Sequence, residues 1–446
     1  MEERDRFQSV AEERAVLVRV IFPESPFEDE PLDELRGLAT TAGTIVVGGM
    51  TQRRNKPNAS AYLGKGKIEE LTVFVENQNA DVVIFDNDLS PAQTRNLEKA
   101  FKVKVIDRTE LILDIFARSA QTYEARLAVE LAQLEYSLPR LKRMWTHLSR
   151  YNMGVGMRGP GEKQLEVDRR LVEKRIHDLK TELKGVEKRK ERQVASRRGH
   201  MTVSLVGYTN AGKSTLMNAL TDASVEAKDK LFATLDTRTR RWQLPNWGPV
   251  LLSDTVGFIR DLPHRLIASF KATLEEVRQA DLLLHIADIS NSAVFNQIGA
   301  VSDVLGEVGI EEKDMLLVIN KTDCLSTSSR LDAVLSRFPN AIPISAANEK
   351  GFDRLALAVS DAISRTFHDV DIETGVENGR LMAYVAEHGE VLSQQFKGNR
   401  VVIHCRLPEK YLGRIKEQGT IVMKHGSELP PQSGGSQDTE SVKDLT

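Results

Sequence analysis

One string of eight residues, GYTNAGKS at 207–214, restricts the fold of this chain more than any other feature. The apolar run VSLVG leads into it, and it matches G-x-x-x-x-G-K-S, which predicts a strand, a tight glycine-containing loop and the start of a helix. In that arrangement the loop N–H groups face phosphate groups, and the helix adds the positive end of its dipole. We therefore expect Lys213 to contact the β- and γ-phosphates of a nucleotide and the Ser214 hydroxyl to ligate Mg²⁺.

Three shorter strings follow at the ends of predicted strands. DTVG follows VLLS, so Asp254 can hold the metal through water and the Gly257 N–H can reach the γ-phosphate. NKTD follows MLLVI, and the Asp323 carboxylate suits the N1–H and the exocyclic amine of guanine, which favours GTP over ATP. SAA at 345–347 follows AIPI and can present a backbone N–H to the guanine carbonyl. Each string alone is common in turns, so their order after GYTNAGKS carries the prediction.

The segment LFATLDTRTRR, between the first two motifs, is where a switch loop must supply a threonine hydroxyl to Mg²⁺ when the γ-phosphate is present. We place this role on Thr234, with Thr237 as the alternative. Phe258 directly follows DTVG, at the position where Ras-like GTPases carry a glutamine that orients the attacking water. A phenyl ring cannot hydrogen-bond water, and one interpretation is that Phe258 packs in the core while another residue positions the water. Slow unassisted hydrolysis and stimulation by a partner are expected.

The chain is expected to form several domains, because 446 residues are too many for a single core. Apolar strands that alternate with helical patterns predict a small parallel α/β domain over 1–108 and a doubly wound α/β nucleotide-binding domain, of the P-loop GTPase class, over 200–368. Residues 369–425 predict a small α+β domain, with LMAYVAEH and RVVIHCRL as strands and EKYLGRIKEQ as a helix. The composition of 426–446 predicts a disordered tail.

The segment 109–199 is predicted to form a long helical hairpin with a glycine-rich tip. Apolar residues recur at helical spacing on both sides of the tip, with one interruption at Pro139. Residues 140–198 hold eighteen Lys and Arg against eight Asp and Glu, an excess of ten in a chain of net charge −3. Because this excess is one-sided and flanks a tip with Arg158, we interpret the hairpin as a polyanion-binding arm rather than a solvated helix face. The absence of Phe, Trp and Tyr from 162–198 favours RNA over a membrane surface.

The cysteines and the N-terminal sequence bear on the cellular compartment. Cys324 and Cys405 are far apart in the chain, and His404 and Cys405, as neighbours in a strand, point to opposite faces, so we expect neither a disulfide nor a zinc site from them. The first twenty residues mix both charge signs, and no stretch approaches the ~18 apolar residues of a membrane span. We expect a monomeric cytoplasmic protein that does not insert into a membrane.

Several longer strings together resemble the HflX family of ribosome-associated GTPases: SLVGYTNAGKST, LFATLD, DTVGFIRDLPH, NKTD, FDNDLSPAQTRNLE, VIDRTELILDIFA and MRGPGEKQLEVDRR. The resemblance covers about residues 10–425. It implies a bacterial GTPase that binds GTP and GDP with Mg²⁺, binds the large ribosomal subunit and its rRNA, and splits or rescues stalled or idle ribosomes under stress. The sequence departs from the family pattern before the tip, where Asn152 and Met153 replace a more glycine-rich start.

Carried over by motif, the resemblance implies roles for individual residues. It is consistent with catalytic roles for Lys213, Thr234 and Gly257, and it implies metal ligation by Ser214 and Thr234. The residues expected to contact the nucleotide are Gly207, Tyr208, Thr209, Asn210, Ala211, Gly212, Lys213, Ser214, Phe232, Ala233, Thr234, Leu235, Asp236, Asp254, Thr255, Val256, Gly257, Asn320, Lys321, Thr322, Asp323, Ser345, Ala346 and Ala347.

Two other functions stay open at this point. The first is a GTP-regulated scaffold or membrane-associated signalling module, in which the basic arm meets acidic lipid or a protein. The second is an ATP-driven nucleic-acid remodeller, which Asp323 disfavours. The N-terminal domain could bind a second nucleotide, although LGKGK at 63–67 is too short to be a P-loop.

Overall fold

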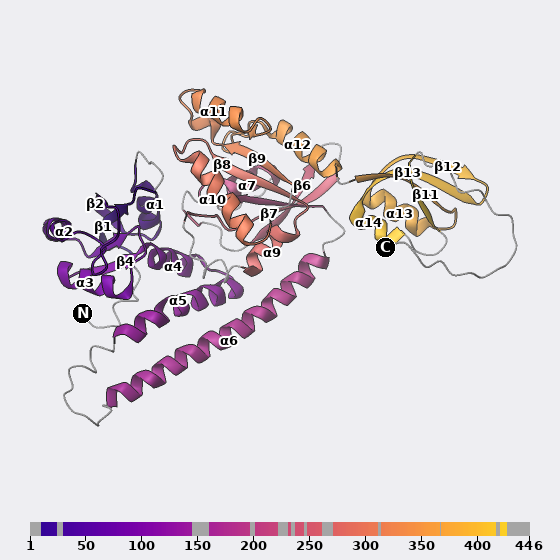
Figure 1. Cartoon of the computed structure of the whole chain (residues 1–446). Helices are drawn as coiled ribbons and strands as arrows, with labels where there is room; N and C mark the ends of the chain where they lie inside the picture. The colour runs from indigo at the N-terminus through magenta and orange to yellow at the C-terminus, as the bar shows by residue number, and fades with distance from the viewer. Residues whose placement is uncertain are drawn as a thin grey trace. The chain divides into compact units, whose positions relative to one another are not determined.

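The chain forms two compact units, Met1–Ser360 and Asp361–Thr446 (Figure 1). The computed structural model describes residues 10–24, 30–144, 160–196, 201–221, 231–232, 237–244, 248–260, 271–310, 314–365, 367–415 and 420–425. Within these ranges, no helix combines the length and the apolar character needed to cross a membrane.

A parallel α/β domain begins the first unit. Its elements are β1 (Arg14–Ile21), α1 (Asp33–Thr41), β2 (Ile45–Arg53), α2 (Lys65–Asn77), β3 (Val82–Phe85), α3 (Pro91–Phe101) and β4 (Lys104–Asp107). The sheet order is β2-β1-β3-β4, and β1, β3 and β4 are buried along most of their length, as strands covered by helices on both faces require. α3 begins with a capping box in which Ser90 and Gln93 each accept the backbone N–H of the other.

Three helices follow this domain: α4 (Arg108–Ser119), α5 (Tyr123–Met144) and α6 (Pro160–Ser196). α5 and α6 lie side by side as the two arms of the predicted hairpin (Figure 1). Ile176, Leu179 and Leu183 of α6 are buried in one core with Leu127 and Leu131 of α5. The helical spacing of apolar residues in the sequence thus corresponds to the face that α6 packs against α5.

The helix interruption predicted at Pro139 is wrong. α5 continues through Pro139, and the break lies earlier, at Ala120, whose backbone is extended with ψ 108°. The next helix begins after Thr122, whose hydroxyl accepts the Ala125 N–H at 3.2 Å. A local helix cap, and not the proline, therefore sets the boundary between α4 and α5.

The nucleotide-binding domain completes the first unit, except that its last helix, α12, continues past Ser360 to Ser364. Its elements are β5 (Thr202–Gly207), α7 (Lys213–Thr221), β6 (Arg238–Leu244), β7 (Gly248–Asp254), α9 (Lys271–Gln279), β8 (Leu282–Asp288), α10 (Val294–Glu307), β9 (Met315–Asn320), η2 (Thr322–Cys324), α11 (Ser329–Arg337), β10 (Ile342–Pro343) and α12 (Phe352–Ser364). The sheet order is β10-β9-β8-β5-β7-β6, and all pairs are parallel except β6 with β7. Because parallel strands run in one direction, the motifs that follow β5, β7 and β9 meet at one edge of the sheet.

The second unit is a split β-α-β-β-α-β domain. Its elements are β11 (Phe367–Gly375), α13 (Gly379–His388), β12 (Glu390–Lys397), β13 (Arg400–Pro408), α14 (Glu409–Ile415) and β14 (Ile421–Lys424). The antiparallel sheet has the order β12-β13-β11-β14, the ferredoxin-like arrangement. These sheets and helices confirm the predicted fold class, in which a parallel α/β domain and a helical hairpin precede the nucleotide domain in the chain and a small α+β domain follows it.

The strand predicted for LMAYVAEH is wrong, because these residues form most of α13. Asn378 caps the helix by accepting the Leu381 N–H at 3.3 Å. A short apolar run fits a helix face and a strand almost equally well, so the cap upstream of it was the better signal.

Candidate nucleotide-binding site

The turn between β5 and α7, residues 207–214, is the phosphate loop predicted from the sequence. Gly207 and Gly212 have φ angles of 153° and 90°. A Cβ at Gly207 would overlap the carbonyl oxygen of Ile286, and one at Gly212 would overlap the Asn320 side chain. Only glycine therefore fits these two positions, as a backbone that wraps closely around a phosphate group requires.

Lys213, at the start of α7, is buried beside this loop. Its ammonium group donates to the carbonyl oxygens of Gly207 at 3.1 Å and Tyr208 at 2.9 Å. Burial lowers the pKa of Lys213 to about 8, and the charge of Asp254 partly opposes this shift. A phosphate group bound here would favour the protonated lysine, because nearby negative charge raises the pKa of a cation.

Ser214 and Asp254 bring two oxygen atoms together next to the loop. The Ser214 hydroxyl donates to Oδ2 of Asp254 at 2.6 Å, and Asp254 is fully buried at the end of β7. A hydroxyl and a carboxylate are the hard oxygen donors that Mg²⁺ prefers. The residues present at the predicted metal position therefore fit Mg²⁺.

The chain after Asp254 lies directly against the phosphate loop. A Cβ at Gly257 would lie 3.0 Å from Nζ of Lys213, so the Gly257 backbone is adjacent to the ammonium group. The Phe258 N–H donates to the Gly207 carbonyl at 3.0 Å, and the Thr209 N–H donates to the Phe258 carbonyl at 2.7 Å. The Phe258 ring is buried in the main hydrophobic core. It packs there, as expected from the sequence, and has no group that could orient water.

Asn320 connects the phosphate loop to the segment 345–347. Its side-chain amide donates to the Ala211 carbonyl at 2.9 Å, and its carbonyl oxygen accepts the Ala346 N–H at 2.9 Å. The exposed carboxylate of Asp323 accepts the Ser345 hydroxyl at 2.5 Å, and this hydrogen bond lowers the pKa of Asp323. An ionised carboxylate held in this way offers acceptors only, which suits the two neighbouring donors of guanine.

The structure thus gathers most of the predicted nucleotide contacts at one edge of the sheet. The members that lie at this edge are Gly207, Tyr208, Thr209, Asn210, Ala211, Gly212, Lys213, Ser214, Asp254, Thr255, Val256, Gly257, Asn320, Lys321, Thr322, Asp323, Ser345, Ala346 and Ala347. Two of them attach the loops to neighbouring backbone. The Thr255 hydroxyl donates to the Leu205 carbonyl, and the Thr322 hydroxyl donates to the Ile344 carbonyl.

The predicted switch loop is described only at its two ends. Ala233, Thr234, Leu235 and Asp236 lie outside the described residues. Phe232 is buried against Phe116 of α4, with ring centroids 4.5 Å apart. The hydroxyl of Thr237, the alternative metal ligand, donates to Glu276 of α9 at 3.1 Å.

Known proteins match this chain over most of its length. The family described as GTP-binding GTPase N-terminal matches residues 29–117, GTP-binding GTPase Middle Region matches 119–197, and 50S ribosome-binding GTPase matches 202–321. The GTPase HflX of Caldanaerobacter subterraneus is 46% identical over 404 residues, which cover 89% of this chain and 92% of that protein. The GTPase HflX of Escherichia coli K12 is 46% identical over 380 residues, 84% of this chain and 88% of that protein. The chain belongs to the HflX family.

Membership of the HflX family confirms the resemblance seen in the sequence and makes the chain a GTP-hydrolysing enzyme. Among solved structures, a GTP-binding protein from the archaeon Sulfolobus solfataricus in complex with GDP is 24% identical with a TM-score of 0.42, covering 79% of this chain and 99% of that one.

Sequence reasoning missed a second role of Tyr208 in this HflX chain. Its hydroxyl donates to Glu34 of α1 at 2.9 Å and accepts the backbone N–H of Arg260 at 2.7 Å. Tyr208 is the second residue of the phosphate loop, and Arg260 lies three residues after Gly257. Burial, followed by the charge of Glu34, raises the pKa of Tyr208, so the hydroxyl stays protonated and can donate. One phenol therefore connects the N-terminal domain to two segments of the nucleotide site.

A buried group of charges surrounds this contact. Arg108 binds Asp86 at 2.6 Å and also pairs with Glu34, and its side chain is only 3% exposed. Asp86 in turn binds Arg19 at 3.2 Å and Arg260 at 3.1 Å. These residues come from distant parts of the sequence. Their one local signal is that the polar strings DND and DR stand at the carboxyl ends of the apolar strands β3 and β4.

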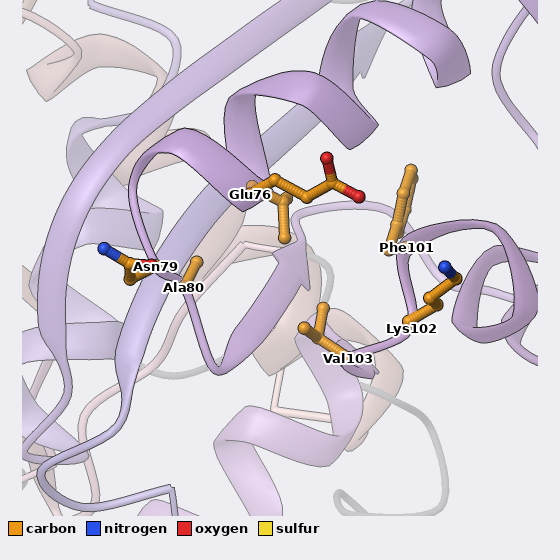
Figure 2. Close-up of a pocket in the computed structure, with 7 residues that line it drawn as sticks. Glu76, Asn79, Ala80, Phe101, Lys102 and Val103 are labelled. Atoms are coloured by element: carbon orange, nitrogen blue, oxygen red, sulfur yellow. The ribbon is translucent and has the colours of Figure 1, made fainter.

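A shallow hollow in the N-terminal domain lacks comparable chemistry. It measures about 330 Å³ and is lined by Val75, Glu76, Asn79, Ala80, Phe101, Lys102 and Val103 (Figure 2). These residues precede β3 and β4 in the chain and so lie at the amino ends of these strands, whereas parallel α/β sheets take ligands at the carboxyl ends. The nucleotide edge of the other sheet is therefore the candidate site.

Proposed function

We propose that this GTPase acts in the cytoplasm as a monomer, binds the large ribosomal subunit through its rRNA, and splits or rescues stalled or idle ribosomes under stress. The observation that carries the proposal is the exposed basic surface of α6 in a chain whose nucleotide domain matches a family of 50S ribosome-binding GTPases. RNA is a dense line of phosphate charges, and clustered lysines and arginines on one helix are the usual surface for it.

α6 has the length and the surface of an RNA-binding arm. Its 37 residues make it about 55 Å long. Its exposed basic residues are Arg169, Arg170, Lys174, Arg175, Lys180, Lys184, Lys188, Arg189 and Arg192. Arg175 and Lys180 also pair with Glu130 and Glu135 of α5, at 2.7 Å each, and so attach the two helices to each other. The predicted tip at 152–161 with Arg158 lies, up to residue 159, outside the described residues.

For the chemistry, we assign each part of GTP to residues at the nucleotide edge. The phosphate loop and Lys213 hold the β- and γ-phosphates, and the Gly257 N–H faces the γ-phosphate. Ser214 and Asp254, with Thr234 from the switch loop, hold Mg²⁺, which neutralises phosphate charge when it is bound with GTP. Asp323 recognises guanine. Phe258 cannot orient the attacking water, so the ribosome is expected to complete the catalytic arrangement.

Charge reversal on α6 tests the RNA-binding arm. The triple variant Lys184→Glu, Lys188→Glu, Arg192→Glu should sediment less with separated large subunits, and its binding should depend less steeply on salt, with a slope reduced by up to about 3. The matched control is Lys184→Arg, Lys188→Arg, Arg192→Lys, which keeps every charge and should bind like the wild type. Binding should be stronger with a non-hydrolysable GTP analogue than with GDP. Wild-type binding by the charge-reversed variant would contradict the role given to α6.

The alternative is a GTP-regulated scaffold or membrane-associated signalling module. It predicts that the wild-type chain binds vesicles of acidic lipid, and that the charge-reversed variant loses this binding while its effect on ribosomes is unchanged. Co-sedimentation with such vesicles and light scattering of ribosomes, measured on the same two variants, separate the two functions.

A further inference from the structure

One face of the C-terminal sheet is covered by helices, and the other carries polar side chains. Apolar residues such as Ile372 and Ile403 alternate along β11 and β13 and share a core with α13 and α14. The intervening residues, among them Asp369, Asp371 and His404, point to the opposite face, because successive strand residues point to opposite sides.

On this polar face, the side chains of two histidines, His404 and His425, lie over β11. In the strand register Asp371 lies opposite His404, and the His425 N–H donates to the Asp369 carbonyl at 3.0 Å just after β14. The His404 ring contacts Asp369, with Nε2 lying 2.6 Å from Oδ1. The His425 ring contacts Asp371, with Nδ1 lying 3.0 Å from Oδ2. The two imidazole rings stack with centroids 3.6 Å apart and planes 11° apart. Three neighbouring strands thus bring two imidazoles and two carboxylates together.

We propose that Asp369, His404 and His425 bind one divalent transition-metal ion, of which Zn²⁺ is the representative. The three residues each offer a ligand atom, and these atoms lie within 4.8 Å of one another. Two imidazoles and a carboxylate are donors that Zn²⁺ and its first-row neighbours accept, whereas Mg²⁺ and Ca²⁺ select oxygen donors. Asp371 holds Nδ1 of His425 and leaves Nε2 for the metal, as the second carboxylate does in many histidine metal sites.

Metal binding requires one small rearrangement. Bond lengths of about 2.0–2.1 Å in a tetrahedral site place ligand atoms about 3.3 Å apart, so the hydrogen bond between His404 and Asp369 has to open. A metal ion lies in the plane of each imidazole that binds it, and two parallel rings cannot share one ion, so one ring has to turn. His425 follows the last residue of β14 and its side chain is 48% exposed, which makes it the ring with room to turn. Water completes the fourth position, as in open zinc sites.

Calorimetric titration of the full chain with ZnCl₂, after removal of metal with a chelator, tests the site. One ion should bind per chain at this site, with micromolar or tighter affinity. His425→Ala and Asp369→Asn should each weaken binding by at least about tenfold, and Asp371→Asn, which removes the group that orients His425, by about 10- to 100-fold. Zn²⁺ should also raise the thermal unfolding temperature of the wild type but not of His425→Ala, because a ligand that binds only the folded state stabilises it.

Two controls separate this site from other zinc-binding groups. His177→Ala removes an exposed histidine on α6, and Cys324→Ser removes an exposed thiol; neither should change the zinc affinity. If His404→Ala fails to fold, His425→Ala still tests the site, since residue 425 lies beyond the last strand. Equal zinc affinity in the wild type, His425→Ala and Asp369→Asn would overturn the proposal, and so would binding that disappears in Cys324→Ser. In either case the two rings would serve only as hydrogen-bond partners of Asp369 and Asp371.

Discussion

The N-terminal sheet and the nucleotide-domain sheet of the first unit use their carboxyl edges in different ways. In the nucleotide domain, the carboxyl ends of β5, β7 and β9 carry the phosphate loop, Asp254 and Asn320, and these groups form a site for a ligand. In the N-terminal domain, Asp86 follows β3 and Asp107 ends β4, at the corresponding edge of that sheet. Both sheets thus carry polar residues at the carboxyl edge, but these residues have different chemical roles in the two domains.

The carboxylates of the N-terminal edge bind the rest of the protein. Asp86 binds Arg260 of the nucleotide domain at 3.1 Å, and Asp107 binds Tyr136 at 2.6 Å and Arg140 at 2.8 Å, both on α5. The edge at which an α/β sheet commonly takes a ligand is here occupied by side chains of this chain. A fold therefore supplies a place for a site, and the residues at that place decide whether a ligand or another domain binds there.

The largest effect should come from breaking the N-terminal edge. Arg108→Ala leaves the buried Asp86 and the partly buried Glu34 without their shared cation, and loss of one member of a buried ion pair costs about 3–5 kcal/mol. Because Asp86 keeps Arg19 and Arg260, we expect a loss of about 3 kcal/mol in the free energy of unfolding, measured by urea titration, with GTP affinity nearly unchanged.

The matched control is Arg108→Lys, which keeps the charge but not the forked guanidinium, and should cost less. An unchanged urea midpoint in Arg108→Ala would mean that the buried charges do not hold the two domains together.

The converse variant alters the nucleotide edge and leaves the N-terminal edge unchanged. Asp323→Asn should lower guanine-nucleotide affinity by about 100-fold or more, since two charge-assisted hydrogen bonds are lost, and should raise xanthine-nucleotide affinity. The free energy of unfolding should stay at the wild-type value because Asp323 is exposed. Titration with fluorescent nucleotides measures the first effect. Equal binding of ATP and GTP by the wild type would refute the guanine assignment.

A pH titration tests the electrostatic contribution of Lys213 at the nucleotide edge. The pKa of Lys213 is about 8 in the free protein, and bound phosphate raises it, so binding takes up a proton above that pH. GDP affinity should be flat below about pH 8 and should fall by about tenfold by pH 9. Asp323→Asn serves as a control, because it should bind more weakly but with the same pH dependence. A flat profile up to pH 9 would show that Lys213 is not the titrating group.

The smallest effect is expected where charges are exposed. Arg175 pairs with Glu130 through two hydrogen bonds of 2.7 and 2.8 Å, but both side chains are more than 40% exposed. Water and salt screen such pairs, so Arg175→Ala should shift the urea midpoint far less than Arg108→Ala. A comparable shift in both variants would show that burial does not explain the strength of the interdomain charges.

The sequence predicted those parts of the site whose signals are local. The phosphate loop, Asp254 and Asn320 each lie at the end of an apolar strand, and the strand, turn and helix that contain a motif are neighbours in the chain. The packed face of α6 was readable for the same reason. The break at Ala120 was not predicted. A cap at Thr122 starts α5, and the helix continues through Pro139, where the interruption was expected.

Contacts between distant residues could not be predicted from the sequence. Glu34, Arg108 and Tyr208 meet only because two domains pack together, and no spacing rule relates their positions. Strand alternation correctly separated His404 from Cys405, yet it could not indicate that His404 stacks on His425 from another strand. The domain boundaries and the role of Thr234 stay predictions.

Single-turnover GTP hydrolysis, with and without purified large ribosomal subunits, tests whether the large subunit completes the catalytic arrangement of this GTPase. Lys213, Ser214 and Asp254 lie together beside the phosphate loop, whereas the buried Phe258 cannot orient water. We expect slow hydrolysis by the chain alone and an increase of roughly 10³- to 10⁵-fold with large subunits, the range that activators supply to other GTPases. Equal rates with and without large subunits would contradict this expectation.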